Sequence, residues 1–169
     1  MGSNSLLHTD EEFAKVYNRN VKRVYQICYL YLKNRHDAQD ASQSIFEKYL
    51  NLNKYFENEH HEKAWFITVS KNHCKDELRK FWRKKRVDLK EMQVLATNKD
   101  SDDLNLAAAL LKLPSKYKDV IYLYYIEGYS VKEISNLLNR KESTLRNHLS
   151  SGRKLLKIDL GGYYEKEEH

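Results

Sequence analysis

Residues 127–156 read EGYSVKEISNLLNRKESTLRNHLSSGRKLL, and this stretch decides the fold of the carboxy-terminal half of the chain. Ser130 and Glu133 have the spacing of a capping box, in which each side chain accepts a hydrogen bond from a free backbone N–H at a helix start. Gly128 suits the end of a preceding helix. Apolar residues then recur at helical spacing, at Val131, Ile134, Leu137 and Leu138. The pattern predicts a helix, a tight turn at 139–141 and a second helix.

The second helix of this pair is amphipathic. Leu145, Leu149, Gly152 and Leu156 share its inner face. Its remaining positions supply polar and basic side chains that suit base edges and phosphates in a DNA major groove, namely Ser143, Thr144, Arg146, Asn147, His148, Ser150, Arg153 and Lys154. An ordinary helical hairpin with a solvated outer face is the alternative interpretation.

Length and composition indicate an all-α chain with one or two small domains. The 169 residues include one proline and five glycines, and no alternating, strand-like run is present. The net charge of +6 and the pI near 9.1 favour a polyanionic partner. Residues 87–103 differ from the rest, with five acidic and two basic residues, so two basic blocks flank an acidic joint.

Several classes of protein are disfavoured by the sequence. No apolar run approaches the ~20 residues that span a bilayer, so we expect a cytoplasmic protein without membrane insertion. Cys28 and Cys74 occupy apolar helical positions and are predicted to be buried free thiols. His60 and His61 fit no zinc spacing, so no metal is expected. We expect no cofactor and no enzyme activity, because neither a phosphate-binding loop nor a nucleophile with a base is apparent.

The first two predicted helices form a core and one acidic stripe. Thr9 and Glu12 offer a capping box for a helix through Tyr31. After a break at 34–37, a second helix buries one face, made of Ala38, Ala41, Ile45, Tyr49 and Leu52. Another face aligns three polar side chains beside an expected exposed edge of Phe46, namely Asp40, Gln43 and Glu47. This stripe is either plain solvated surface or a docking surface for a basic partner.

A long third helix, predicted at about 62–86, follows a polar break at 53–63 that holds Tyr55 and Phe56. Its inward positions are Phe66, Ile67, Ser70, Cys74, Leu78 and Phe81. Trp65 and Trp82 rim the opposite face, which carries Thr68, Lys71, Asn72, Lys75 and Arg79. A basic stripe edged by aromatic rings suits single-stranded nucleic acid. Partial burial is expected for Trp65, and solvated lysines are the alternative to nucleic-acid binding.

We therefore predict two small helical domains, at 10–86 and 104–160, joined by a linker at 87–103. The second domain begins with Leu104, Ala107, Ala108 and Leu111. Pro114 then stands where a helix can begin. A strongly apolar helix follows and is predicted to form the floor of the helix-turn-helix, with Val120, Ile121, Leu123, Tyr124 and Ile126.

At this point the motifs resemble a known family. Residues 37–46, DAQDASQSIF, resemble the region-two signature of sigma factors of the sigma-70 family. The following helix resembles the next part of that region at Ala64, Trp65, Phe66, Val69, Asn72, Asp76 and Arg79. Leu113, Pro114, residues 120–128 and the helix-turn-helix are similar to region four. The order of the motifs and the short linker resemble the extracytoplasmic-function group.

The resemblance implies a dissociable subunit of bacterial RNA polymerase that directs core enzyme to promoters, helps to melt them and has no catalysis of its own. Asp40, Gln43, Phe46 and Glu47 would dock on the clamp helices of the polymerase. The minus-10 element would be contacted by Tyr55, Phe56, Lys71, Asn72, Lys75 and Arg79. Region four would sit on the polymerase flap and read the minus-35 element with the outer face of the last helix. An anti-sigma factor is a further implied partner.

Three positions depart from the family pattern. Arg140 stands where an apolar residue is usual, Lys141 replaces a capping serine, and Ser151 replaces an arginine. These departures predict a looser turn and one missing phosphate contact.

Two rival functions remain open from sequence. A stand-alone helix-turn-helix repressor or activator, whose first domain senses a ligand or dimerises, leaves the basic and aromatic helix near Trp65 without a role. An adaptor that binds only protein leaves the basic faces of the third and the last predicted helices without a function.

Overall fold

A computed structural model describes residues 9–52, 54–84 and 109–160, which form helices and short connections with no strand among them. The chain divides into two units, Met1–Leu95 and Ala96–His169. The all-α prediction is confirmed. The linker predicted at 87–103, and the domain start predicted at Leu104, Ala107 and Ala108, lie outside the described residues.

The first unit opens with α1, Asp10–Leu32, whose start has the predicted capping box. The Glu12 backbone N–H donates to Thr9 Oγ1 at 3.2 Å, and the Thr9 N–H donates to Glu12 Oε2 at 3.0 Å. The helix ends at Lys33, which takes the left-handed conformation with φ 57° and donates its N–H to the Tyr29 carbonyl. A local sequence signal therefore defines the start of α1, and a left-handed residue that the sequence did not predict closes its end.

The second helix, α2, spans Arg35–Leu50 and begins earlier than predicted. The Asn34 side chain accepts a hydrogen bond from the Asp37 N–H at 3.0 Å, so Asn34 caps the helix and shortens the expected break. Ala38, Ala41, Ile45 and Tyr49 are buried, as the spacing predicts. Leu52 lies beyond the end of α2 and is only half-buried, so its place on this helical face was predicted wrongly.

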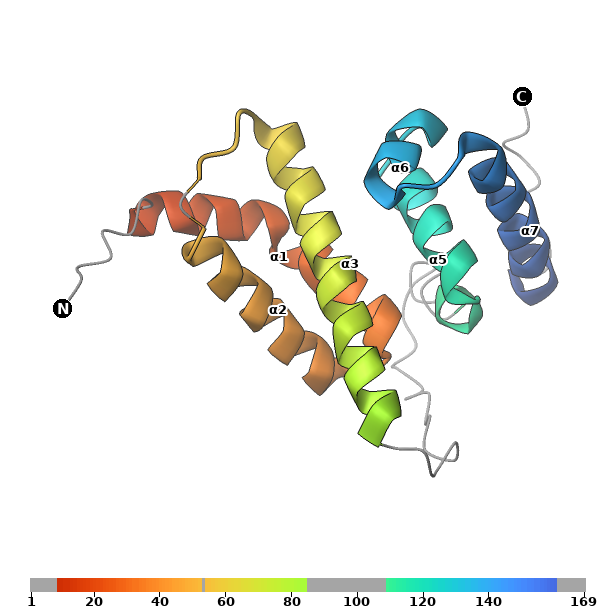
Figure 1. Cartoon of the computed structure of the whole chain (residues 1–169), viewed down its shortest axis with the longest axis horizontal. Helices are drawn as coiled ribbons and strands as arrows, with labels where there is room; N and C mark the ends of the chain where they lie inside the picture. Colours follow the sequence, from red (N-terminus) through yellow and green to blue (C-terminus); the bar gives the residue numbers. More distant parts are fainter. Residues whose placement is uncertain (1–8, 53, 85–108, 161–169) are drawn as a thin grey trace. The chain divides into compact units, whose positions relative to one another are not determined.

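The third helix, α3, spans Glu59–Lys84. Its start precedes the predicted one because the Asn58 side chain accepts a hydrogen bond from the His61 N–H at 2.9 Å. α1 packs against both α2 and α3, and α2 packs against α3 (Figure 1). Together the three helices enclose one core.

Aromatic rings fill much of this core. Tyr49 and Phe66 are fully buried at its centre, with ring centroids 5.5 Å apart. Phe13 and Tyr17 of α1 cover one side of the cluster, and Trp65 meets Phe66 edge-on at 4.9 Å. The aromatic contacts join all three helices of the unit.

The far end of α3 differs from the prediction. Phe66, Ile67, Ser70 and Cys74 are buried as expected, but Leu78 is half-buried and Phe81 is 45% exposed. The 26 residues of α3 exceed the 16 of α2, and Figure 1 shows the last turns of α3 running past the first turn of α2. Helical periodicity therefore continues into turns where the apolar face is only partly covered.

A buried ionic cluster also ties α1 to α3, and the sequence pattern had not predicted it. The Glu62 carboxylate accepts two hydrogen bonds from the Arg19 guanidinium, at 3.0 and 2.8 Å. It also accepts one from Asn20 Nδ2 at 2.6 Å. The bond to Glu62 raises the pKa of Arg19. Because Glu62 is buried and charged, these donors compensate for its lost hydration.

The second unit begins, in its described part, with helical residues 109–112. After Pro114 come α5, Ser115–Ile121, and η1, Tyr122–Ile126, which is a π-helix. The Glu127 N–H closes its wide turn on the Tyr122 carbonyl at 3.1 Å. Val120, Ile121 and Leu123 are buried, but Tyr124 and Ile126 are exposed. The apolar face predicted to lie beneath the helix-turn-helix therefore contains fewer buried residues than expected. The wider π-helical turn changes the 3.6-residue periodicity on which that prediction depended.

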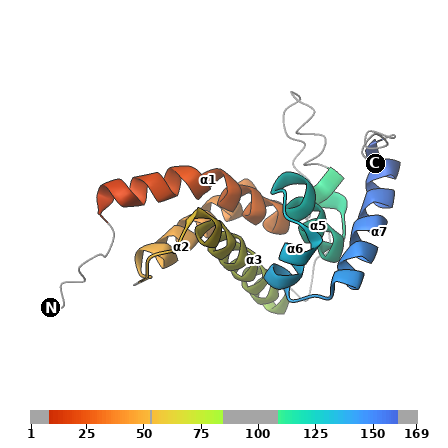
Figure 2. The same cartoon turned by 90° about the horizontal axis from the view of Figure 1, so that it is seen from above.

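Two further helices, α6, Val131–Leu138, and α7, Glu142–Leu160, complete the unit, and both pack together (Figure 2). Gly128, with φ +74°, precedes α6 as predicted. α7 also packs against α5, most closely at Gly152. A Cβ at position 152 would lie 2.8 Å from Ile121 Cγ1 and 3.4 Å from Tyr117 Cβ, so glycine permits this approach.

We expect Gly152→Ala to destabilise the chain by up to about 2 kcal/mol net, because the added methyl overpacks the α5–α7 contact at a cost of about 1–3 kcal/mol. Alanine offsets roughly 1 kcal/mol of that cost through its higher helix propensity. Thermal unfolding followed by circular dichroism measures the change. Ser151→Ala, one residue away, is the control and should leave the midpoint nearly unchanged. A higher midpoint for Gly152→Ala would contradict the overpacking argument.

Candidate nucleic-acid interface

The helix-turn-helix of the second unit has the predicted geometry. At the start of α6, the Glu133 N–H donates to Ser130 Oγ at 3.2 Å and the Ser130 N–H donates to Glu133 Oε2 at 2.9 Å. Asn139 ends α6 in the left-handed conformation, with φ 53°. α7 then buries its inner face, made of Leu145, Leu149, Gly152 and Leu156. The opposite face of α7 is consequently turned away from α5 and α6.

The outer face of α7 carries most of the predicted DNA-binding residues. Ser143, Arg146, Asn147 and Lys154 are exposed, and Thr144, Ser150 and Arg153 are half-buried. Arg146 Nη2 lies 3.0 Å from Glu142 Oε2 one turn earlier, and Arg153 Nη1 donates to the Tyr125 hydroxyl at 3.2 Å. Tyr125 therefore orients one basic side chain of this face, a contact that the sequence pattern did not predict.

His148 is placed differently from its prediction. Its ring meets the edge of Tyr117 on α5, with centroids 5.5 Å apart. Its Nδ1 atom is buried and has no hydrogen-bond partner among the described residues. Burial, followed by the positive charges of Arg140 and Lys116, lowers the pKa of His148. His148 thus lies at the side of α7 that contacts α5 and is half-buried, and its contact with DNA stays a prediction.

The turn between α6 and α7 is anchored rather than loose. The Arg140 guanidinium donates to both carboxylate oxygens of Asp119 on α5, at 3.1 and 2.7 Å. It also donates to the Lys116 carbonyl at 3.3 Å. The looser turn predicted from the departure at Arg140 is therefore wrong, since the arginine forms an ion pair with a buried carboxylate.

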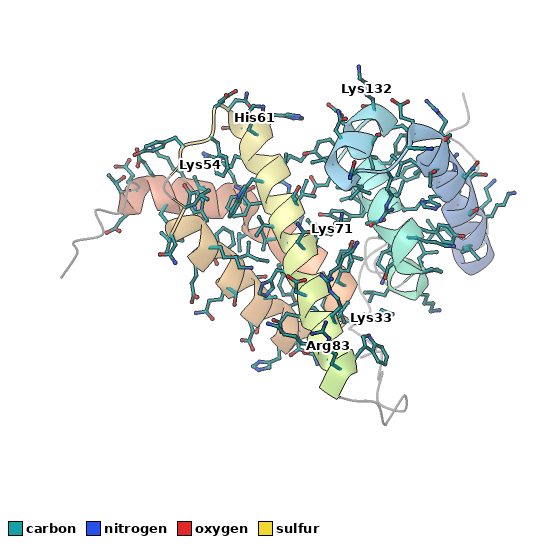
Figure 3. All side chains as sticks on the ribbon, viewed as in Figure 1. Lys33, Lys54, His61, Lys71, Arg83 and Lys132 are labelled. Carbon is teal, nitrogen blue, oxygen red and sulfur yellow. The ribbon has the colours of Figure 1, made fainter. Side chains whose placement is uncertain are left out.

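The first unit presents a second polar and basic face along α3. Asn72 and Arg79 are exposed, and Lys71 and Lys75 are half-buried. Arg79 pairs with Asp76 one turn away. Figure 3 shows Lys54 before α3, His61 in its first turn, Lys71 at mid-length and Arg83 toward its end, so positive or ionisable groups follow the helix throughout.

Aromatic side chains lie at both ends of this face. Tyr55, in the connection before α3, is 62% exposed, whereas Phe56 is half-buried between Tyr49 and Trp65, at 6.1 and 5.7 Å. Trp65 is partly buried, as predicted, and Trp82 is exposed at the far end. Tyr55 is thus the more accessible aromatic ring of the predicted pair, while Phe56 supports the connection from the core side.

The acidic stripe on α2 is exposed at Asp40, Gln43 and Glu47. Phe46 is not part of that surface, because only 5% of it is exposed. Its ring lies 4.8 Å from Tyr17 and 5.2 Å from Phe66. The expected exposed edge of Phe46 was therefore wrong, since periodicity did not reveal that α1 would cover this ring.

Cys28 and Cys74 are buried free thiols, as predicted. They come from α1 and α3 and meet in the core, where the hydrogen bond with Cys28 and burial raise the pKa of Cys74. Among the described residues, no three His, Cys, Asp or Glu side chains converge to hold a metal ion. Within the same ranges, no helix has the length and hydrophobicity to cross a membrane.

Comparison with known proteins identifies both halves of the chain. Residues 16–84 match the family model for sigma-70 region 2, and residues 103–156 match the one for sigma-70 region 4. RNA polymerase sigma factor SigV of Bacillus subtilis is 29% identical over 138 residues, which cover 80% of this chain and 83% of SigV. The extracytoplasmic-function (ECF) RNA polymerase sigma factor SigW of the same species is 28% identical over 168 residues, 89% of each chain.

Solved structures show the same fold. The sigma factor RpoE of Bartonella quintana, in complex with the anti-sigma factor NepR, superposes with a TM-score of 0.75 at 20% identity, over 89% of this chain and 98% of RpoE. CnrH, in complex with the cytosolic domain of CnrY, gives a TM-score of 0.63 at 17% identity, over 92% and 91% of the two chains.

We expect the second unit to lose stability as the pH falls from ~7.5 to ~5.5, because of His148. Its lowered pKa keeps the folded imidazole neutral at pH values where the unfolded chain, with the ordinary value of ~6.5, has already taken up a proton. The stability is therefore fully present above that value and falls as the pH drops below it. Hydrogen exchange of α7 amides reports the change. His148→Gln should flatten the pH dependence of α7 stability. His61→Gln, in the first unit, is the control and should leave it unchanged. Equal pH dependence in the wild type and in His148→Gln would refute the attribution to His148.

Proposed function

Since the chain belongs to the sigma-70 family, as a member of its extracytoplasmic-function group, we propose that its two units divide promoter recognition between them. As an RNA polymerase sigma factor, the protein binds core enzyme and directs promoter-specific transcription initiation. In this proposal, residues 10–86 dock on core enzyme and open the minus-10 element. Residues 104–160 bind the minus-35 element, and residues 87–103 link the two.

One observation carries this division of roles. The chain has two separate helices, α3 and α7, that each bury an apolar face in their own unit and expose a polar, basic face. The aromatic side chains Tyr55, Trp65 and Trp82 accompany α3, whereas the outer face of α7 carries small polar and basic side chains. Flat rings suit unpaired bases, and small polar side chains suit the edges of paired bases.

Docking on core enzyme is assigned to the exposed stripe Asp40, Gln43 and Glu47 of α2. Carboxylates on a rigid, exposed helix complement a basic partner surface, and the clamp helices of the polymerase are the proposed partner. Phe46 lies on the buried side of α2 and joins this helix to the aromatic core through contacts with Tyr17 and Phe66. Its contribution is to hold the helix in place rather than to contact the polymerase.

Strand opening is assigned to α3 and the connection before it. Lys71, Lys75 and Arg79 would neutralise phosphates of the nontemplate strand, and Asn72 would hydrogen-bond a base. The exposed Tyr55 would stack on a base taken out of the duplex, with Phe56 fixing the connection beneath it. The Arg79–Asp76 pair lies on an exposed surface, where ion pairs are weak, so Arg79 can exchange its partner for a phosphate.

Upstream recognition is assigned to α7. Its amino-terminal half would place Ser143, Arg146 and Asn147 at base edges in the major groove, with Thr144 and Ser150 beside them. Arg153 and Lys154, two turns later, would contact phosphates. The exposed pair of Arg146 with Glu142 would open on binding for the same reason as that of Arg79. The polymerase flap is the proposed protein partner of this unit.

Further properties follow from family membership. We propose a cytoplasmic protein without catalysis of its own. An anti-sigma factor is a proposed partner, because the RpoE chain that shares this fold was solved in complex with one.

Transcription with purified components tests the function. The protein should direct core RNA polymerase to defined start sites on a linear promoter library, as measured by transcript mapping, and core enzyme alone should not. Tight operator binding by the free protein, without promoter-specific initiation when core enzyme is added, would instead establish a stand-alone repressor or activator.

We expect Asn72→Ala and Lys75→Ala to reduce strand opening by roughly tenfold, since a hydrogen bond or a charge-assisted contact is worth about 0.5–3 kcal/mol. Binding of the closed duplex should change much less. Permanganate reactivity of unpaired thymines measures opening, and gel shift at low temperature measures duplex binding. Asp40→Arg is the matched control, because it should weaken the binding of core enzyme itself. Equal losses of opening and duplex binding for Asn72→Ala would remove this residue from the opening site.

A further inference from the structure

Arg140 connects three elements of the second unit at the point where α7 begins. Its backbone carbonyl accepts a hydrogen bond from Ser135 Oγ of α6 at 2.6 Å, and its N–H donates to the Ser135 carbonyl at 3.3 Å. Its side chain binds Asp119 of α5. Since α7 starts at Glu142, two residues later, the path of the chain into α7 is determined by these bonds.

The Arg140–Asp119 pair has the geometry of a rigid anchor. Arg140 Nη1 donates to Asp119 Oδ1 and Arg140 Nη2 donates to Asp119 Oδ2, and this bidentate pairing fixes orientation as well as distance. Only 5% of the Asp119 side chain and 22% of the Arg140 side chain are exposed, so water and salt screen the pair weakly. The Lys116 carbonyl accepts a further bond from Arg140, so α5 is engaged at two of its residues.

The same geometry separates Arg140 from the basic residues of the outer face. Arg146 and Lys154 extend from the exposed face of α7, whereas the Arg140 guanidinium is directed at α5 and is largely covered. Leaving Asp119 to reach a phosphate would remove two hydrogen bonds and a countercharge from a buried carboxylate, which is costly. Arg140 is therefore suited to hold α7 and unsuited to contact DNA.

We propose that Arg140, acting through Asp119, is a positioning residue that sets the orientation of α7 and so determines how strongly the protein discriminates between upstream sequences. This inference rests on the proposed reading of the minus-35 element by α7. Base-edge hydrogen bonds depend on alignment, whereas phosphate attraction tolerates displacement. Loss of the anchor therefore reduces discrimination more than it reduces overall affinity for DNA.

The test is a double-mutant cycle in full-length protein with core RNA polymerase. Promoters are first selected from a randomised library by the wild-type holoenzyme. Initiation is then compared on a selected promoter and on the same promoter with a scrambled upstream element. Arg140→Ala should lower that ratio by about tenfold, the size of one well-aligned base contact. Initiation from a pre-melted template without the upstream duplex should be unchanged, which a general loss of folding would not allow.

The cycle distinguishes positioning from direct contact. If Arg140 acts through Asp119, Arg140→Ala should cause no further loss of discrimination in an Asp119→Ala background. An equal loss in both backgrounds would overturn the proposal, because it would show that Arg140 contacts DNA independently. A ratio unchanged by Arg140→Ala would overturn it as well. Lys141→Ala, an exposed neighbour in the same turn, is the control and should have an effect independent of Asp119.

Two checks complete the design. Helix content by circular dichroism at the assay temperature shows whether each variant is folded. If Arg140→Ala does not fold, the cycle is repeated with Arg140→Lys and Asp119→Asn, because lysine keeps the charge but cannot form the bidentate hydrogen bond. A wild-type holoenzyme that initiates equally from selected and scrambled upstream elements would refute the proposed minus-35 reading itself, and this inference with it.

Discussion

A buried carboxylate must find fixed hydrogen-bond donors, and in each unit of this protein one such carboxylate joins two segments of the chain. Glu62 lies between α1 and α3 and is held by Arg19 and Asn20. Asp119 lies on α5 and is held by Arg140. In both cases the arginine comes from a different segment of the chain, so compensation of one buried charge joins elements that are distant in sequence. Apolar packing encloses these units, and the ion pairs add directional constraints to it.

The consequence for function is that two helices are held with one face outward. α3 is fixed by the aromatic core and by Glu62, so the side with Asn72 and Arg79 remains accessible. α7 is fixed by its leucines, by the close approach at Gly152 and by the turn that Arg140 anchors. Binding residues on packed helices lose little freedom when they engage a ligand. Under the proposed division of roles, one such helix in each unit gives this sigma factor separate surfaces for single-stranded and for double-stranded DNA.

Two positions where prediction from sequence was wrong, Phe46 and Phe81, share one cause. Both lie on helices that were correctly expected, as does Tyr124. The error at Phe46 and Phe81 concerned the neighbouring helices: α1 covers Phe46, whereas Phe81 lies in the last turns of α3 and is 45% exposed. Helical periodicity assigns residues to faces, but the length and position of other helices determine how far each face is buried. At Tyr124 the π-helical turn changed the periodicity itself.

The amino-acid sequence by itself determined the all-α class, the helix caps at Thr9 and Ser130, the amphipathic faces of the helix-turn-helix and the resemblance to sigma factors. These depend on interactions between residues a few positions apart, which a single sequence records directly. Only the tertiary structure decided the pairing of Glu62 with Arg19, the meeting of Cys28 with Cys74 and the anchoring of the turn by Arg140. Each joins residues at least 21 positions apart, and such partners become adjacent only when helices pack.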